Sequence, residues 1–136
     1  MLVYQCAPAR RTATRRDRAL LRAALQAAEG HHSGGTWHIV AYTSEGNVGR
    51  NQVSKTPHSP KLYPPTSGRH AESALVDAAR DLSGQTVAVA GMIEGRPMAT
   101  TVPCSGCAAA LTDAHAAWVV AFRDGQPVRF RPAELC

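Results

Sequence analysis

Two cysteines in one short segment stand at a spacing that suits metal chemistry. Cys104 and Cys107 lie three residues apart in Pro103-Cys104-Ser105-Gly106-Cys107. At the start of a helix both thiols share one face and can grip a single ion. A helix N-terminus also favours the thiolate form that binds metal. The pair alone leaves three interpretations open: a catalytic metal site, a structural zinc site, and a thioredoxin-type redox pair.

His70 and Glu72 favour the catalytic interpretation. They stand at a second predicted helix start, after a proline-rich loop that can leave an opening above a metal. With the two cysteines they make three ligands and one uncommitted carboxylate. A vacant fourth position is typical of catalytic zinc, which lowers the pKa of water from about 16 toward 7. Because neighbours two apart on a helix point in different directions, we expect Glu72 to move protons between this water and a leaving amine.

The combination His70-Ala71-Glu72 and Pro103-Cys104-Ser105-Gly106-Cys107 resembles the signature of the cytidine deaminase superfamily. In these zinc-dependent enzymes the metal activates water for attack on the ring carbon that bears an exocyclic amine, and the glutamate moves protons without binding the metal. The resemblance implies Zn²⁺ as cofactor, His70, Cys104 and Cys107 as its ligands, and Glu72 as the catalytic residue. It also implies a three-layer α/β/α fold around a central five-stranded mixed sheet.

Two positions separate the chain from the small tetrameric cytidine deaminases. Those enzymes usually carry Cys-Ala-Glu at the first site and an Arg-Gln pair after the second cysteine, whereas this chain has His70 and Ala108-Ala109. A histidine ligand is shared with deaminases of deoxycytidylate, transfer-RNA adenosine, guanine and polynucleotide cytidine, and with deaminase toxins of bacterial conflict systems. The resemblance leaves all of these branches open.

Four further residues are candidates for substrate binding. In many relatives an asparagine before the His-x-Glu helix contacts the sugar or base, and Asn51 stands where such a residue could be; an ordinary turn asparagine is the alternative. Peptide groups beside the ligands help to hold the base in relatives, which implies Ala71 and Pro103. Tyr63, near the expected entrance, could stack on a base or pin the loop.

The elements that position these residues follow from hydrophobic spacing. Apolar residues at helical spacing predict helices over 14–26, 70–82 and 104–114, the first ending near Gly30. Strands are predicted over 37–42, 48–53, 86–93, 118–122 and 128–130, with a turn over 94–97 and a loop over 55–69 that contains four prolines. The order α-β-β-α-β-α-β-β favours a three-layer α/β arrangement in a single deaminase-like domain over residues 1–136. The direction of the last strand, which separates branches of the superfamily, does not follow from the sequence.

Composition and charge limit the class of protein. The longest uncharged apolar run, 86–93, is far shorter than the roughly 20 residues of a membrane span, and the first residues lack the apolar centre of a signal peptide. We therefore expect a cytoplasmic protein without membrane attachment. The formal net charge is +5, and six arginines stand in the first quarter of the chain. They form either a phosphate-binding face or a solubilising one.

The leading functional prediction is hydrolytic deamination of a cytosine-type base to the uracil-type product with release of ammonia. A free nucleoside, nucleotide or related small metabolite suits a short chain that begins with its own methionine. A single-stranded nucleic acid, as in editing enzymes or toxins, suits the arginines and the proline-rich loop. A zinc-stabilised nucleic-acid-binding module without turnover is the non-enzyme alternative. Assembly into a homo-oligomer stays open.

Overall fold

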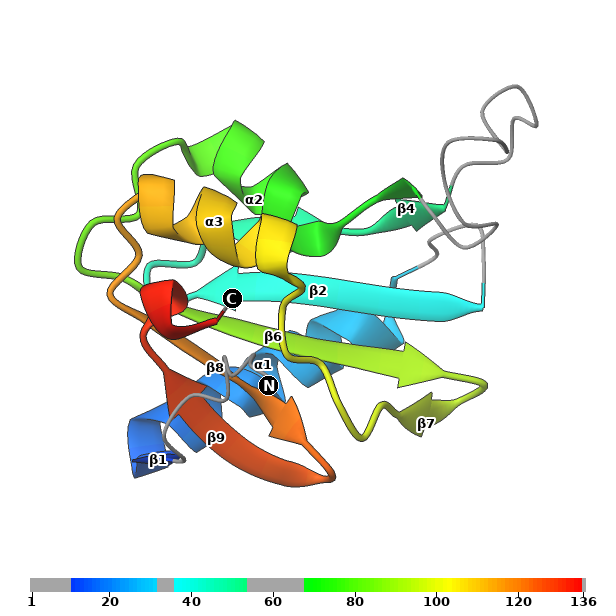
Figure 1. Cartoon of the computed structure of the whole chain (residues 1–136). Coiled ribbons are helices and arrows are strands. Elements are labelled where there is room, and N and C mark those ends of the chain that lie inside the picture. Colours follow the sequence, from blue (N-terminus) through cyan, green and yellow to red (C-terminus); the bar gives the residue numbers. More distant parts are fainter. Residues whose placement is uncertain (1–10, 32–35, 54–67, 136) are drawn as a thin grey trace, which may run out of the picture.

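The computed structural model describes residues 11–31, 36–53 and 68–135, in which a mixed β-sheet carries helices on both faces (Figure 1). Its seven strands within these ranges are β1 (Arg11–Thr12), β2 (Trp37–Thr43), β3 (Val48–Arg50), β6 (Thr86–Ile93), β7 (Arg96–Pro97), β8 (Trp118–Arg123) and β9 (Gln126–Phe130). They follow the order β1-β9-β8-β6-β2-β3, with β7 paired to β6. The β6–β8 pair is parallel and the other pairs are antiparallel.

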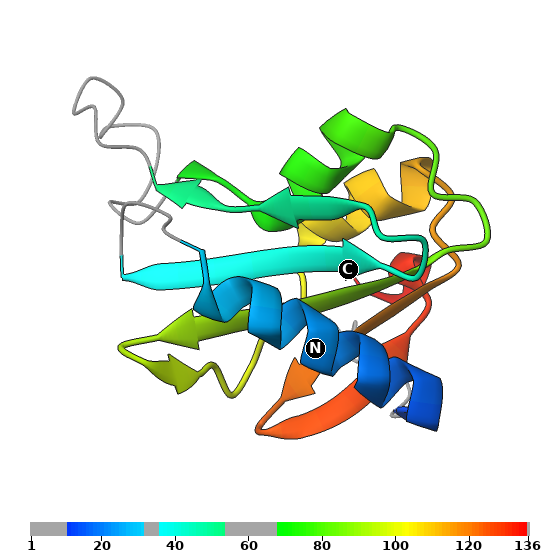
Figure 2. The same cartoon turned by 180° about the vertical axis from the view of Figure 1, so that it is seen from behind.

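Three α-helices of the described residues form the outer layers. α1 (Arg15–Glu29) crosses one face of the sheet, as Figure 2 shows from behind. α2 (Ala71–Ala79) and α3 (Ser105–Asp113) lie side by side on the opposite face, where the short 3-10 helix η1 (Pro132–Glu134) also packs. This arrangement confirms the predicted three-layer α/β/α order.

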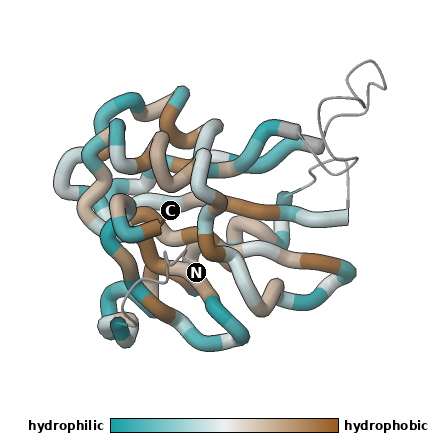
Figure 3. Tube along the Cα trace, viewed as in Figure 1, coloured by the Kyte–Doolittle hydropathy of each residue, from teal (hydrophilic) through white to brown (hydrophobic). Residues whose placement is uncertain are grey.

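Alternation along the strands divides the core between the two faces. In β6, Val87 and Val89 face α2 and α3, whereas Ala88 and Ala90 pack with Leu21 of α1. The small alanines leave room for α1 to lie close to the sheet, and the larger valines fill the space under the other two helices. Hydrophobic segments accordingly run along the central strands in Figure 3, and hydrophilic segments occupy many of the turns.

The predicted sheet of five strands has too few strands. The five predicted strands are present, but the described residues add β1 and β7, each only two residues long. Such short strands have no periodicity to recognise in a sequence. Residues 94–97, predicted as a turn, form the tight turn at Glu94 and Gly95 and then the β7 strand, which returns along β6.

Two predicted elements are shorter than expected. The helix predicted over 70–82 ends at Ala79, because Arg80 adopts a left-handed conformation with φ of 64°. Leu82 then turns into the core, and its amide donates to the Ala114 carbonyl at 2.7 Å. The strand predicted over 48–53 is divided at Asn51 into β3 and β4 (Gln52–Val53), and β4 pairs with β5 (Gly68–Arg69) in a separate two-stranded sheet.

The direction of the last strand does not follow from the sequence, and in the structure β9 runs antiparallel to β8.

None of the helices in the described ranges is long and apolar enough to cross a membrane. Tyr63 and most of the predicted 55–69 loop lie outside the described residues. That residues 1–136 form one domain stays a prediction.

Candidate functional site

The first residues of α2 and α3 bring the sequence-predicted chemical groups together. His70 is the N-cap residue of α2 and Cys104 is the N-cap residue of α3, both with extended backbone conformations. Cys107 follows in the first turn of α3. Because the two helices lie side by side on the same face of the sheet, their N-terminal ends meet. Side chains 34 and 37 residues apart in the sequence thereby become neighbours.

The three predicted ligands have the geometry of a metal site. His70 Nδ1 lies 3.2 Å from the Cys107 sulfur and 3.7 Å from the Cys104 sulfur. All three donor atoms lie within 4.8 Å of one another. Tetrahedral zinc with ordinary bond lengths would separate a nitrogen and a sulfur ligand by about 3.5 Å. The cluster of His70, Cys104 and Cys107 therefore fits a metal ion such as Zn²⁺ in both donor chemistry and spacing.

Electrostatics at Cys107 also suit a cation. The sequence predicts that the helix N-terminus lowers the pKa of this thiol, but burial raises it, and the nearby Glu72 carboxylate and Cys104 sulfur raise the pKa further. A buried thiolate beside other anionic groups is costly unless a positive charge compensates for it. A metal ion held by the three ligands would supply that charge.

Glu72 is the second residue of α2, and its side chain is only 6% exposed. Burial raises the pKa of its carboxyl group; its own backbone amide, His70 and the Cys107 thiol lower the pKa by smaller amounts. A carboxyl group with a raised pKa, beside a candidate metal site and lining a cavity, is typical of a general acid or base.

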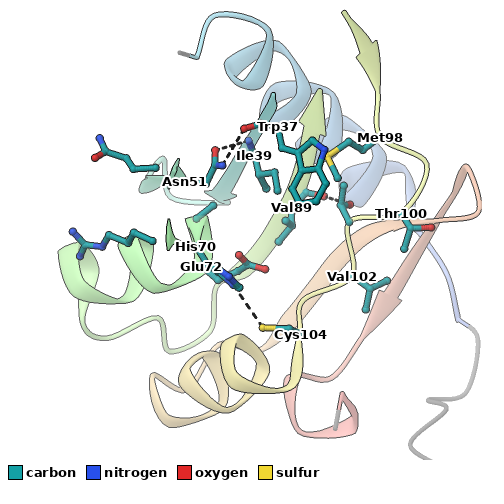
Figure 4. Close-up of a pocket in the computed structure, with 14 residues that line it drawn as sticks. Trp37, Ile39, Asn51, His70, Glu72, Val89, Met98, Thr100, Val102 and Cys104 are labelled. Atoms are coloured by element: carbon teal, nitrogen blue, oxygen red, sulfur yellow. Dashed lines mark hydrogen bonds between the residues drawn. The ribbon is translucent and has the colours of Figure 1, made fainter. Parts of the chain in front are cut away.

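A cavity of about 220 Å³ opens beside Glu72. Figure 4 shows His70, Glu72 and Cys104 on one side of it, with Trp37 and Met98 on the other. Ile39, Val89 and Val102 contribute further apolar wall. The volume is below the roughly 300 to 1,000 Å³ of sites for drug-sized ligands, so the described walls suit one small ring compound.

Asn51 lines the cavity, and its side chain makes hydrogen bonds to β2 that a strand backbone would otherwise make. Its side-chain oxygen accepts from the Ile39 amide at 2.8 Å, its side-chain nitrogen donates to the Trp37 carbonyl at 3.0 Å, and its own amide donates to the Ile39 carbonyl at 3.0 Å. The side chain thus bonds to β2 where a continuing strand would use its backbone carbonyl. Contact between Asn51 and a substrate stays a prediction.

Because the Asn51 side chain accepts from the Ile39 amide, the Asn51 backbone carbonyl group can accept a hydrogen bond from His31 instead. Its ring Nε2 donates to the Asn51 carbonyl at 2.7 Å, and the side chain is buried at 8% exposure. Histidines outside helices and strands are more often solvated, but His31 is buried and hydrogen-bonded. The histidine instead connects the C-terminal end of α1 to the wall of the cavity.

The other predicted substrate contacts have different positions. Ala71 is buried and lines the cavity. Pro103 is buried directly before Cys104 but does not line this cavity. Tyr63 lies outside the described residues. A role in binding substrate stays a prediction for all three.

Two residues without a predicted functional role, Trp37 and Thr101, help to build the site. Trp37, expected only as part of a strand, is 38% exposed and forms a cavity wall. Thr101 holds the segment that leads to Cys104: its hydroxyl donates to the Val89 carbonyl at 2.6 Å and accepts from the Phe122 amide at 3.0 Å. One signal in the sequence could have identified Trp37 as a cavity wall. Trp37 stands at the start of a predicted strand, and the hairpin that follows this strand leads the chain back to Asn51.

The fold is that of the cytidine deaminases. The 1.6 Å crystal structure of cytidine deaminase from Burkholderia pseudomallei is similar to this chain with a TM-score of 0.57 and 19% sequence identity, over 90% of this chain and 95% of that chain. Comparisons by sequence gave no match to a family model or to a curated protein. At this identity the likeness shows the fold alone, and it confirms the fold class that the resemblance implied.

Proposed function

We propose that this protein is a zinc-dependent hydrolytic deaminase that converts a cytosine-type base to the uracil-type product. The observation that carries the proposal is the buried Glu72 beside the cluster of His70, Cys104 and Cys107, at one side of a small cavity. A structural zinc site has no need of such a carboxylate, and a redox pair has no need of His70.

The chain supplies the proton transfers. Zn²⁺ at the cluster would supply an activated water molecule for attack on the ring carbon that bears the exocyclic amine. Glu72 takes one proton from that water as the carbon–oxygen bond forms. Glu72 gives this proton to the ring nitrogen beside the attacked carbon and then moves the proton of the new hydroxyl group to the exocyclic nitrogen. The carbon–nitrogen bond breaks, the hydroxyl becomes a carbonyl, and ammonia leaves. Burial raises the pKa of Glu72, which helps it to hold the proton during these transfers.

The cavity walls suit a planar ring. Trp37, Met98 and Val89 provide an apolar surface opposite Glu72, on which one face of a base can stack. An amide oxygen can accept two hydrogen bonds and an amide nitrogen can donate two, so Asn51 can serve β2 and a substrate together. The peptide groups of Ala71 and Pro103, and the Tyr63 ring, complete the proposed substrate contacts.

A small substrate is favoured over a polynucleotide. The described cavity is small, and the arginines of α1 lie on the face of the sheet opposite α2 and α3, away from the cavity. We therefore take a free nucleoside, nucleotide or related metabolite as the substrate and retain single-stranded nucleic acid as the alternative. Cytoplasmic residence and assembly into a homo-oligomer also remain predictions.

The test is ammonia release by the purified protein with its zinc content measured. Cytidine, deoxycytidine, their monophosphates, adenosine, guanine and a single-stranded DNA oligonucleotide are offered in parallel. Glu72→Gln serves as the matched control, since it keeps the size of the side chain and removes its proton chemistry. We expect turnover of a small cytosine compound, and loss of turnover in Glu72→Gln with zinc retained.

Other results would contradict the proposal in distinct ways. Turnover of the oligonucleotide alone would exchange the small substrate for the polynucleotide. Zinc binding without turnover of any cytosine compound would favour the binding module. A reversible disulfide between Cys104 and Cys107, in a protein whose metal content is unchanged in His70→Ala, would favour the redox pair.

A further inference from the structure

Arginines gather on the α1 face of the sheet, at the end where β6 and β8 begin. The group, here called the arginine surface, comprises Arg11, Arg15, Arg16, Arg18, Arg129 and Arg131. Two acids, Asp17 and Glu134, lie among them. This surface therefore carries +4 of the chain's formal net charge of +5.

Trp118 organises the centre of this surface. The guanidinium carbon of Arg129 lies 3.7 Å from the indole centroid and that of Arg131 lies 3.9 Å from it, while that of Arg11 lies 5.4 Å away. Two planar groups so close to one centroid require opposite faces of the indole. Stacking of this kind fixes the guanidinium plane and leaves its N–H edge available for anions.

The acids neutralise only part of the surface. Arg11 pairs with Glu134 and Arg129 pairs with Asp17. Arg131 forms no ion pair with a carboxylate of the described residues, although its charge helps to lower the pKa of Glu134, and its guanidinium donates to the Ala117 carbonyl at 3.4 Å. Arg16 and Arg129 line a groove of about 590 Å³, together with Ser44, Thr86 and the acid Asp17, which pairs with Arg129. Cationic and hydroxyl groups in one groove are suited to phosphate oxygens.

The arginine surface does not lead into the candidate active site. Along β9, Val128 and Phe130 belong to the core under α2 and α3, so Arg129 between them points to the α1 side. The Arg131 guanidinium lies with that of Arg129 against the Trp118 ring. The cavity beside Glu72 lies on the α2 and α3 side. A ligand on the arginines is therefore separated from the cavity by the sheet itself.

We propose that the arginine surface binds the phosphate backbone of nucleic acid, independently of the deaminase site. Guanidinium groups match phosphate with paired hydrogen bonds. Because both faces of Trp118 are covered by arginines, a base cannot stack on this ring, so we expect contacts to phosphate to predominate.

The test compares two double variants that remove the same charge. Arg16→Gln with Arg131→Gln alters the arginine surface, and Arg80→Gln with Arg96→Gln alters exposed arginines at the end of α2 and in β7. Binding of a fluorescein-labelled, mixed-sequence single-stranded DNA is measured by anisotropy over a range of salt concentrations. For the first variant we expect about tenfold weaker binding and a salt slope smaller by about 1.4, the value for two lost phosphate contacts on a single strand. The second variant should bind as the unaltered protein does.

A second readout reports on the surface directly. The chain has two tryptophans, so Trp37→Phe leaves Trp118 as the only one. We expect DNA to change the fluorescence of Trp118 in this variant. We also expect DNA to bind Glu72→Gln with the same affinity as the unaltered protein, so that failure of the proposed reaction and failure of this inference can be told apart. Equal weakening in both double variants, absence of DNA binding at low salt, or binding of polyglutamate in preference to DNA would each overturn the inference.

Discussion

Replacement of Gly49 by alanine should displace the helix that carries His70 and Glu72. Gly49 lies in β3 directly under α2, where a Cβ atom would lie 2.7 Å from the Leu75 Cβ and still closer to the Ala71 carbonyl oxygen and the Leu75 amide nitrogen. Ordinary contact begins at 3.4 Å. Two of the three obstructing atoms belong to the backbone of α2, so no rotamer change relieves them. The helix would have to withdraw by roughly 1 Å.

Gly49→Ala should lower both the stability of the protein and its activity. Overpacking of this kind typically costs about 1–3 kcal/mol, and the backbone clash places Gly49→Ala near 3 kcal/mol. For a chain of this size that corresponds to a fall in melting temperature of about 10 °C. A displacement of about 1 Å at the catalytic group can reduce kcat/KM about a hundredfold. Because the same movement separates His70 from the α3 cysteines, zinc content should fall as well.

The assays are thermal unfolding, zinc content and ammonia release, each compared with Gly30→Ala. Among the described residues, a Cβ atom at Gly30 would meet only the Ala27 carbonyl oxygen, at 4.0 Å, so this variant makes the same chemical change without a clash there. If Gly49→Ala unfolded at the temperature of Gly30→Ala and kept its zinc, the close approach of β3 and α2 would not be what positions His70 and Glu72.

Three further outcomes follow from individual contacts. Asn51→Ala removes both side-chain bonds to β2 and should lower the free energy of unfolding by about 2–3 kcal/mol in urea titrations; an unchanged midpoint would contradict this. Trp37→Ala should raise KM about tenfold with a smaller effect on kcat, measured by steady-state kinetics, because it removes stacking surface and no reacting group. The Arg11 side chain and the Arg131 amide lower the pKa of Glu134 to about 2, below its unfolded value of about 4.3. Their stabilisation is therefore complete above about pH 4.5 and lost as pH falls toward 2, a dependence that Glu134→Gln should remove from acid unfolding curves.

The sequence was informative where chemistry and local structure coincide. His70, Cys104 and Cys107 stand at helix starts, and these helix starts follow from loop residues before them and apolar spacing after them. Capping residues and periodicity act within a few positions, so the three α-helices and five longer strands of the described ranges could be predicted. The fold class followed because the order of these elements permits few arrangements.

What could not be predicted depends on contacts between distant segments. Asn51 looks like a turn residue until β2 lies beside it, and only then does its amide take the place of a strand carbonyl. The buried position of His31 depends on its hydrogen bond to the backbone carbonyl of Asn51, which lies 20 residues away in the sequence. Gly49 has no unusual backbone angle, and its requirement for a bare Cα comes from α2 above it. None of these three features leaves a local pattern in the sequence.

The helix ends show how the chain divides its residues between stability and chemistry. α1 begins with a reciprocal capping box, in which the Thr14 amide donates to Asp17 at 2.9 Å and the Asp17 amide donates to Thr14 at 3.1 Å. α2 and α3 have no side-chain cap, because His70 and Cys104 occupy the capping positions. An ordinary cap contributes about 1 kcal/mol, so the two helices together forgo about 2 kcal/mol.

In return, the positive ends of both helix dipoles lie where the Glu72 carboxylate and the cysteine sulfurs need stabilisation as anions. The lost stability must then come from packing, and Ala71, Leu75, Ala108 and Leu111 are each no more than 1% exposed. This dependence on packing is why a single methyl group at Gly49 is expected to disturb the site more than the loss of a cap would.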